Sequence, residues 1–396
     1  SEPMSTTLRH RIYSLDLLRG LVMVIMALDH TRDFFHFDAF LHDPLDGATT
    51  TPILYFTRWI THFCAPVFVF LAGTSIHLQH LRKPTSDLSA FLVKRGLWLL
   101  VVEFVLITFA WTFSWSFPVL IMGVIAAIGF GMLGMAAVIR LPFNMILALG
   151  LAIVLGHNIL DSVPSTHQGF TWDLLRNGNF AFHPIGAGHQ LAIIYPILPW
   201  LGLMMVGYCA GQLYAPDFNG ARRKRTLLWS GAGLILLFVL LRVLNVYGDP
   251  GPWAAHTELS RTIMSFLDVQ KYPPSLLYLC MTIGPALLFL AVAEPLNNGL
   301  TRAISVFGRV PFFYYVLHFY LLHLLGMALF VAQGHALSDP TPDVYGIPFR
   351  YLIVGEGYSL TVVYGIWIGL VLALYPLCRW FNAYKQRHTF WWLSYV

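Results

Sequence analysis

Apolar segments about twenty residues long recur along the chain, and they constrain its fold more than any other feature. A helix of about twenty apolar residues crosses the ~30 Å hydrocarbon core of a bilayer. Such segments fall at approximately 14–36, 53–80, 91–113, 115–139, 143–163, 190–214, 226–247, 274–296, 304–332 and 358–382. Only 11% of the residues are charged, whereas roughly a quarter are charged in soluble domains. The sequence therefore predicts an all-α polytopic membrane protein of about ten transmembrane helices.

The distribution of basic residues predicts the orientation of these helices. Lys and Arg concentrate in short segments that join alternate helices, such as 82–95 and 222–225. Short basic loops are typical of the cytoplasmic side of a membrane, so both the N and the C terminus are expected there. The longer segments on the other side are rich in His, Asp, Trp and Pro, and they cover 34–56, 164–189, 248–273 and 333–357. Functional polar groups are therefore expected at the extracytoplasmic ends of the helices.

The joints between helices divide the chain into one large domain with short ends. We expect a cytoplasmic N-terminal segment at 1–13, a single transmembrane domain at 14–382 and a cytoplasmic tail at 383–396. Ser1-Glu2-Pro3 before Met4 is expected to be a cloning remnant. The net charge of +5 is scattered over helix ends without a nucleic-acid motif, so no nucleic-acid partner is predicted.

The first helix carries ionisable residues at membrane depth, where each costs about 2.5–3.5 kcal/mol to insert. Arg19 and His30 are eleven residues apart and so share one helix face, ~16 Å from each other. Asp16 and Arg19 are spaced to pair. Asp33 is likewise spaced to contact the imidazole of His30 and to fix its tautomer, as suits a general base. The alternative is a structural one, in which Asp16 and Arg19 simply anchor the helix.

Further polar side chains fall at the outer ends of other helices or within the bundle, and they are expected to converge on one cavity. These candidate substrate-binding residues are Arg32, Arg58, His62, His157, Lys271 and His318. For each histidine the alternative is a hydrogen bond between helices. The spacing of His, Cys and acidic residues predicts no metal site.

Five stretches resemble the family of heparan-α-glucosaminide N-acetyltransferase and its bacterial relatives. They are 11–23 (RIYSLDLLRGLVM), 58–75 (RWITHFCAPVFVFLAGTS), 195–202 (YPILPWLG), 271–276 (KYPPSL) and 308–318 (GRVPFFYYVLH). The resemblance implies a bacterial inner-membrane enzyme that moves an acyl group, usually acetyl from acetyl-CoA, to an extracytoplasmic sugar amine or hydroxyl. The spacing of Arg19 and His30 is also similar to a first-helix motif of the wider membrane acyltransferase superfamily, where the histidine is catalytic.

The resemblance leaves the identity of the base open. In the lysosomal relative the catalytic histidine lies further past the first helix, so His36 or His42 is an alternative to His30. The hypothesis is that His30 acts as base or acyl carrier, oriented by Asp29 or Asp33, with Arg19 on the same face. The phosphates of acyl-CoA would bind at the inner side, at Arg82, Lys83, Arg95 and Arg223.

The sequence leaves the partners and the choice between two functions to be determined. The partners implied are the lipid bilayer, acyl-CoA and a glycan or other small acceptor, and a homodimer is possible. The rival function is a proton-coupled transporter, because intramembrane Arg, Asp and His residues also serve export. Paired halves with broken helices are typical of transporters, and the sequence shows no such internal symmetry.

Overall fold

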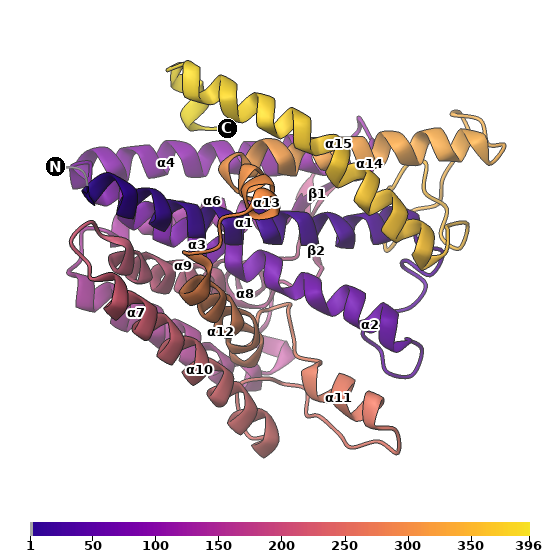
Figure 1. The fold of residues 1–396 in the computed structure, drawn as a ribbon. Coiled ribbons are helices and arrows are strands. Elements are labelled where there is room, and N and C mark those ends of the chain that lie inside the picture. The colour runs from indigo at the N-terminus through magenta and orange to yellow at the C-terminus, as the bar shows by residue number, and fades with distance from the viewer. Residues whose placement is uncertain (1–2) are drawn as a thin grey trace.

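The computed structural model describes residues 3–396, and long helices packed side by side dominate it (Figure 1). Ser1 and Glu2 of the expected cloning remnant lie outside the described residues. The long helices of the first half are α1 (Pro3–Phe35), α3 (Cys64–His80), α4 (Thr85–Val101), α6 (Val124–Val138) and α7 (Phe143–Gly156). Those of the second half are α9 (Ile197–Ala210), α10 (Gly220–Leu244), α12 (Leu276–Ala293), α14 (Pro311–Ala332) and α15 (Leu360–Arg387).

The two ends of the bundle differ in character. Helix α1 begins and α15 ends at the same end, on the left in Figure 1. The opposite end carries the long loops together with two short helices, α2 (Pro52–Trp59) and α11 (Leu259–Leu267) (Figure 1). We call this second end the loop end. It is the end at which the sequence predicts the functional polar groups.

Seven helical stretches among the described residues are long and apolar enough to cross a membrane. They are Pro52–His80, Phe143–Ser162, Ile197–Tyr214, Gly220–Leu244, Leu276–Ala293, Pro311–Ala332 and Leu360–Arg387. The prediction of a helical multi-pass protein is confirmed, but only these seven of the ten predicted spans meet this measure. Helix α1 carries too many charged residues, α4 is 17 residues long before it changes to a π-helix, and α6 has 15 residues.

The second predicted span is not one regular helix. It consists of α2, a 3-10 turn at Ile60–Phe63 and α3. Pro66 has no N–H and so cannot bond to the carbonyl of His62, four residues earlier. The hydroxyl of Tyr278 on α12 donates to that carbonyl oxygen instead, at 2.8 Å. The regular helix is therefore interrupted at His62, next to Tyr278 of α12.

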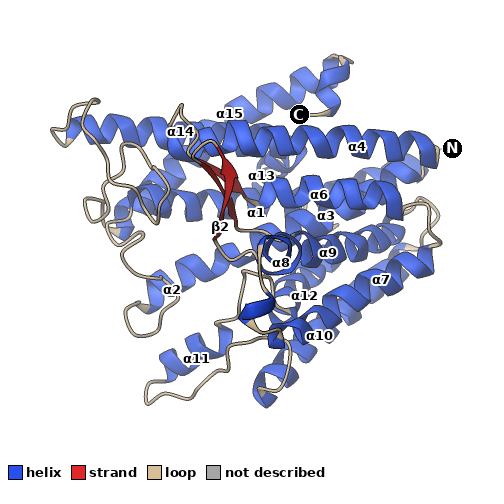
Figure 2. Cartoon of the chain, turned by 180° about the vertical axis from the view of Figure 1, so that it is seen from behind, coloured by secondary structure: helices blue, strands red, loops and turns tan. Residues whose placement is uncertain are grey.

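A small sheet corrects the all-α prediction. It has the strand order β1-β3-β2, with β1 (Val119–Met122) parallel and β2 (Ala181–Gly186) antiparallel to β3 (His189–Ile193) (Figure 2). Two of these strands form the starts of the predicted spans 115–139 and 190–214. A short apolar run cannot be assigned to helix or strand from its periodicity alone, which is why the prediction was wrong there.

The predicted span 304–332 is two helices rather than one. Helix α13 (Gly299–Arg309) ends just before Val310, and α14 begins at Pro311. Proline is favoured in the first turn of a helix but disrupts the interior of one. Pro311 thus separates a short amphipathic helix from a long apolar helix that reaches the loop end.

Helices α1 and α13 approach each other at two glycines. A Cβ atom at Gly20 would lie 2.0 Å from the backbone oxygen of Ile304, and one at Gly308 would lie 1.9 Å from that of Asp16. Only residues without a Cβ allow two helix backbones to come so close. This contact fixes the position of α1, which carries most of the charged side chains discussed below.

Substitution of Gly20 by Ala is therefore expected to destabilise the protein by roughly 1–3 kcal/mol, because backbone atoms of α13 must move. The matched control is Gly365→Ala in α15, where an added Cβ would meet no atom within 4 Å. The unfolding midpoint of each variant in detergent measures the effect. Equal midpoints for the two variants would contradict the tight α1–α13 contact.

Candidate active site

A cavity of about 660 Å³ lies at the loop end of the bundle. One wall comes from α1 and the junction between α2 and α3, and another comes from the segments around Tyr195 and Tyr272. The floor includes Glu103, and the mouth includes Asp43 and Asp268. Parts of the chain that are distant in sequence thus meet here, as the polar segments of the sequence predicted.

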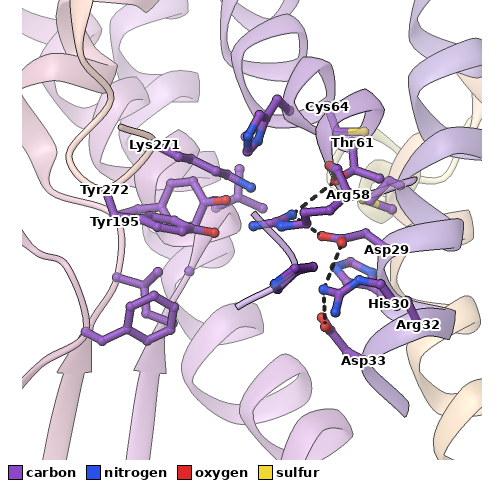
Figure 3. Close-up of a pocket in the computed structure, with 18 of the residues that line it drawn as sticks. Asp29, His30, Arg32, Asp33, Arg58, Thr61, Cys64, Tyr195, Lys271 and Tyr272 are labelled. Atoms are coloured by element: carbon purple, nitrogen blue, oxygen red, sulfur yellow. Dashed lines mark hydrogen bonds and ion pairs between the residues drawn. The ribbon is translucent and has the colours of Figure 1, made fainter. Parts of the chain in front are cut away.

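Charged residues of the α1 wall form one connected network (Figure 3). The carboxylate of Asp29 accepts from Arg58 at 2.6 Å and from Arg32 at 3.2 Å. Arg32 also donates to Asp33 at 2.6 Å, and Arg58 donates to the hydroxyl of Thr61 at 3.1 Å. The structure therefore brings four predicted site residues, Asp29, Arg32, Asp33 and Arg58, to one place.

His30 lines the same cavity and contacts a second histidine. Its Nδ1 lies 2.7 Å from Nε2 of His318 on α14, and Nδ1 of His318 lies 3.2 Å from the carbonyl oxygen of Tyr314. A carbonyl oxygen only accepts, so Nδ1 of His318 carries a proton and its Nε2 is an acceptor. Nδ1 of His30 must then donate, which leaves the lone pair on Nε2 of His30 for a substrate.

This contact corrects the predicted orientation of the base. Asp33 was expected to hold the imidazole of His30, but its carboxylate pairs with Arg32. The carboxylate of Asp29 likewise takes Arg58 and Arg32 rather than the imidazole. A guanidinium competes more strongly for a carboxylate than a neutral imidazole does. The tautomer of His30 is therefore set by His318.

His62 also lines the cavity, and neither of its ring nitrogens has a hydrogen-bond partner within the described residues. Its side chain is 1% exposed. A buried polar atom without a partner typically costs about 1–3 kcal/mol. His62 is therefore poised to take up a hydrogen bond from a molecule in the cavity.

The wall opposite α1 contains Lys271, Tyr272 and Tyr195, which we call the tyrosine wall. Figure 3 shows these three side chains facing Arg58 and Asp29 across the cavity. Lys271 was predicted as a site residue, whereas the two tyrosines were not. The one signal in the sequence was their place in the KYPPSL and YPILPWLG stretches. Their rings lie edge-on, with centroids 5.4 Å apart.

Glu103 is a further cavity residue that the sequence did not assign to the site. It lies in a π-helical segment, Val102–Ile107, and π-helical turns are frequent at functional sites. Its carboxylate accepts from the backbone N–H of Ala126 at 2.7 Å, at the start of α6. A carboxylate is stabilised there by the free N–H groups and the helix dipole. Glu103 thus joins the cavity floor to α6.

His318 contacts His30 but does not itself line the cavity, and two further predicted site residues also lie outside the lining. Arg19 donates to Asp16 at 3.1 Å, to the carbonyl oxygen of Gly308 at 3.0 Å and to Ser75 at 3.2 Å, and it is not among the lining residues. It joins α1 to α13 and α3, and these contacts favour the structural alternative over the predicted catalytic role. His157 is buried in the turn after α7 and is likewise absent from the cavity lining.

The predicted coenzyme-binding residues lie toward the other end of the bundle, and two of them already contact other protein groups. Arg223 is 2% exposed and pairs with Glu294 at 2.6 Å, so its guanidinium does not face a ligand. Arg95 donates to the carbonyl oxygen of Ser394 near the C-terminus. Arg82 and Lys83 follow α3 and are exposed. The burial of Arg223 and its pair with Glu294 therefore favour a structural role over the predicted coenzyme contact.

The two other candidates for the base occupy different places. His42 lines the cavity near the mouth, where it pairs with Asp38 at 2.7 Å and is half-exposed. His36 lines a separate small pocket that it shares with Glu356 and Tyr358. Among the three histidines only His30 combines a place inside the main cavity with a second imidazole that fixes its tautomer.

Carboxylates gather at the mouth of the cavity. Burial and the neighbouring carboxylate of Asp43 raise the pKa of Asp268 to about 6, although Arg242 opposes this shift. Asp249 and Asp46 act in the same direction as Asp43. A raised pKa means that folding disfavours the ionised form of Asp268. This residue therefore lowers the stability of the folded state progressively as the pH rises from about 4 to 6, and fully above that.

Substitution of Asp268 by Asn is expected to raise the melting temperature at pH 8 but to leave it nearly unchanged at pH 4. Since the side chain is partly exposed, water screens the repulsion, and the gain should be only roughly 1–3 °C. Thermal unfolding in detergent at the two pH values measures it. A gain that is equal at both values, or larger at pH 4, would contradict the assignment.

No group of three or more His, Cys, Asp or Glu side chains suited to hold a metal ion occurs among the described residues. The apolar helices and the polar cavity define the class: a multi-pass helical membrane protein with an acid–base site at one end of the bundle. The model of the family described as heparan-α-glucosaminide N-acetyltransferase, catalytic, matches residues 11–243. The match covers more than half of the chain, so the protein belongs to this family and is a membrane acetyltransferase. A comparison with curated proteins gives no match.

The matched region ends before part of the site. It contains Asp29, His30, Arg58 and His62, and it also contains Tyr195. Three further site residues come from the chain that follows the matched region: Lys271, Tyr272 and His318. The fold supplies them by bringing the segment before α12 and the middle of α14 against α1.

Proposed function

We propose that this protein transfers an acetyl group from cytosolic acetyl-CoA to a sugar amine or hydroxyl on the extracytoplasmic side of a bacterial inner membrane. The observation that carries the proposal is that His30 lines a cavity at the loop end and contacts His318, within a chain of the acetyltransferase family. The loop end then faces the outside, and both termini face the cytoplasm. Residues 14–382 form one transmembrane domain that crosses the membrane ten times.

In the proposed reaction His30 acts through Nε2. This nitrogen either takes the proton of the acceptor amine or hydroxyl, or attacks the thioester and carries the acetyl group itself. His318 supports both routes, because it accepts a hydrogen bond from Nδ1 of His30 and so shares the charge that develops on the ring. Asp29, which interacts electrostatically with His30, stabilises the same charge.

The other cavity residues bind and polarise the substrates. The acyl carbonyl gains negative charge when the acceptor attacks, and Arg58 and Lys271 lie on the two facing walls to stabilise it (Figure 3). His62 has both ring nitrogens available for the acceptor. Arg82, Lys83 and Arg95 remain the proposed contacts for the phosphates of acetyl-CoA at the basic end of the bundle.

The donor must pass between helices to reach His30. On α1 the deepest residue that lines the cavity is Met26, and on α3 it is Phe68. Between Met26 and the basic end, α1 is packed through buried Leu15, Leu18 and Val22. Binding of acetyl-CoA from the cytoplasm therefore requires helices to part, and the Gly20–Gly308 contact makes the α1–α13 face the least suited to do so.

A sided assay tests the proposed function. Purified protein is inserted into vesicles, radiolabelled acetyl-CoA is supplied on one side, and glucosamine or a short oligosaccharide is supplied on the other. We expect labelled product to form on the side that the loop end faces. Movement of unmodified glucosamine down or against a proton gradient, with no acetylated product, would contradict an acetyltransferase.

A further inference from the structure

Tyr272 is held in a fixed orientation at the edge of the cavity. Its ring packs edge-on against those of Phe180 and Tyr195, with centroid distances of 5.2 Å and 5.4 Å. The side chain of Gln270 donates to the backbone oxygen of Tyr272 at 2.9 Å. Ser275 caps the start of α12 by accepting from the N–H of Tyr278 at 3.0 Å. Both the ring and the backbone of Tyr272 are therefore anchored.

Three side chains that can donate a hydrogen bond lie around the hydroxyl of Tyr272. Those of Lys271 and Tyr195 come from its own wall, and that of Arg58 comes from the facing wall (Figure 3). Lys and Arg side chains only donate, so the phenolic oxygen can serve them only as an acceptor. The O–H of Tyr272 itself is then left to donate to a molecule in the cavity, which Tyr272 lines.

Two positive charges make this hydroxyl a stronger donor than an ordinary phenol. The ammonium nitrogen of Lys271 lies 5.1 Å from the centre of the Tyr272 ring. Burial alone would raise the pKa of Tyr272, but Lys271 and Arg58 outweigh it and hold the pKa below its ordinary value. A more acidic O–H forms a stronger hydrogen bond to a developing negative charge.

We propose that Tyr272 is a further catalytic residue, whose O–H donates to the oxygen of the acyl carbonyl as that oxygen becomes negative. The proposal rests on the proposed function and names the donor for its oxyanion. Arg58 is already bound to Asp29 and Thr61, and Lys271 interacts with the phenol itself. The Tyr272 hydroxyl is thus the donor that these two cations support, on the wall opposite α1.

The step balances within the residues present. The acceptor nitrogen or oxygen forms a bond to the acyl carbon and gives its proton to Nε2 of His30. The carbonyl π pair moves to the oxygen, which Tyr272 stabilises. When this pair returns, the carbon–sulfur bond breaks, the sulfur leaves with the bonding pair, and His30 gives it the proton. Tyr272 keeps its own proton throughout, so the products are the acetylated acceptor and the free thiol.

The test compares two variants that each lose one phenolic oxygen. Tyr272→Phe is expected to lower kcat by roughly 10²–10³-fold, as the loss of one oxyanion donor does, with little change in the KM for acetyl-CoA. The control is Tyr247→Phe, whose hydroxyl donates to Leu155 away from the cavity. The control should keep wild-type kcat. If the wild type is active and the kcat of Tyr272→Phe lies within threefold of it, the role of Tyr272 is overturned while the proposed function stands.

A pH profile separates a chemical role from a structural one. The titratable or charged groups that face Tyr272 are Lys271, Arg58, Tyr195, Tyr278 and Tyr315. In the wild type, kcat should fall at alkaline pH as Tyr272 loses its proton. Lys271→Met should move this fall to higher pH, because a supporting cation is gone. An unmoved alkaline limb in folded Lys271→Met would count against the proposal, even if Tyr272→Phe failed to fold. No turnover in the wild type itself would overturn the proposed function, and Tyr272 with it.

Discussion

Substitution of His30 by Ala should lower kcat for acetyl transfer by roughly 10²–10⁴-fold while the protein remains folded, because the acceptor loses its base. The structure singles out this imidazole, since His318 fixes its proton on Nδ1 and leaves the lone pair of Nε2 in the cavity. His318→Ala should retain more activity than His30→Ala. It removes the support for the correct tautomer but leaves the base.

The histidines at other positions supply matched controls. His42 is at the mouth and His335 pairs with Glu356 on the outer surface, so His42→Ala should lose little activity and His335→Ala none. Initial rates with radiolabelled acetyl-CoA measure all four variants. If His42→Ala lost its activity while His30→Ala kept it, the assignment of His30 as the base would be contradicted.

Substitution of Asp29 by Ala should be among the most damaging changes to stability, at about 3–5 kcal/mol. Asp29 is the shared partner of Arg58 and Arg32, whose side chains are only 12% and 7% exposed. Removal of the carboxylate leaves Arg58 buried without its acidic partner and leaves Arg32 with Asp33 alone. We expect a lowered unfolding midpoint and, in the same variant, a large loss of activity.

A double variant separates charge from shape. Asp29→Ala combined with Arg58→Met removes the uncompensated charge of Arg58 and replaces it with an apolar side chain. It should therefore be more stable than Asp29→Ala alone, as replacement of a whole ion pair is better tolerated than removal of one partner. A double variant that is less stable than the single one would show that the network does not act through charge compensation.

The sequence predicted the membrane class and much of the α1 wall for one physical reason. Charged side chains are costly at membrane depth, so Asp29, Arg32 and Arg58 are conspicuous in apolar segments and reside where a cavity and partners accommodate them. The same reasoning also selected Arg19, which lies outside the cavity lining. Its cost is offset by pairing with Asp16 and by contacts to α3 and α13 rather than by a cavity.

The rest of the site depends on contacts that spacing along one helix does not reveal. His30 and His318 are 288 residues apart. The expected i,i+3 contact between His30 and Asp33 does not form, because Asp33 pairs with Arg32 instead. Tyr195 and Tyr272 resemble the aromatic residues common at membrane interfaces, so their type alone does not mark them as site residues. The short strands β1 and β3 were concealed in apolar runs that extend into helices.

The fold also explains why the site lies at one end of the bundle. The break between α2 and α3 presents His62, the π-helical segment presents Glu103, and the sheet precedes Tyr195. Each of these is a departure from regular helix close to the loop end. Irregular backbone is tolerated in a membrane protein where it lines a cavity or is buried in protein. The irregular segments therefore supply the lining of the cavity, and the cavity is the place where irregular backbone is tolerated.

The central claim is that acetyl transfer takes place at His30 in the cavity of the loop end. A structure determined with a non-hydrolysable acetyl-CoA analogue bound tests it most directly. The account predicts that the acyl carbonyl carbon lies within about 3–3.5 Å of Nε2 of His30 or of an acceptor that His30 contacts. An analogue bound with its acyl group near Arg19 or at the basic end, away from His30 and Tyr272, would contradict the account.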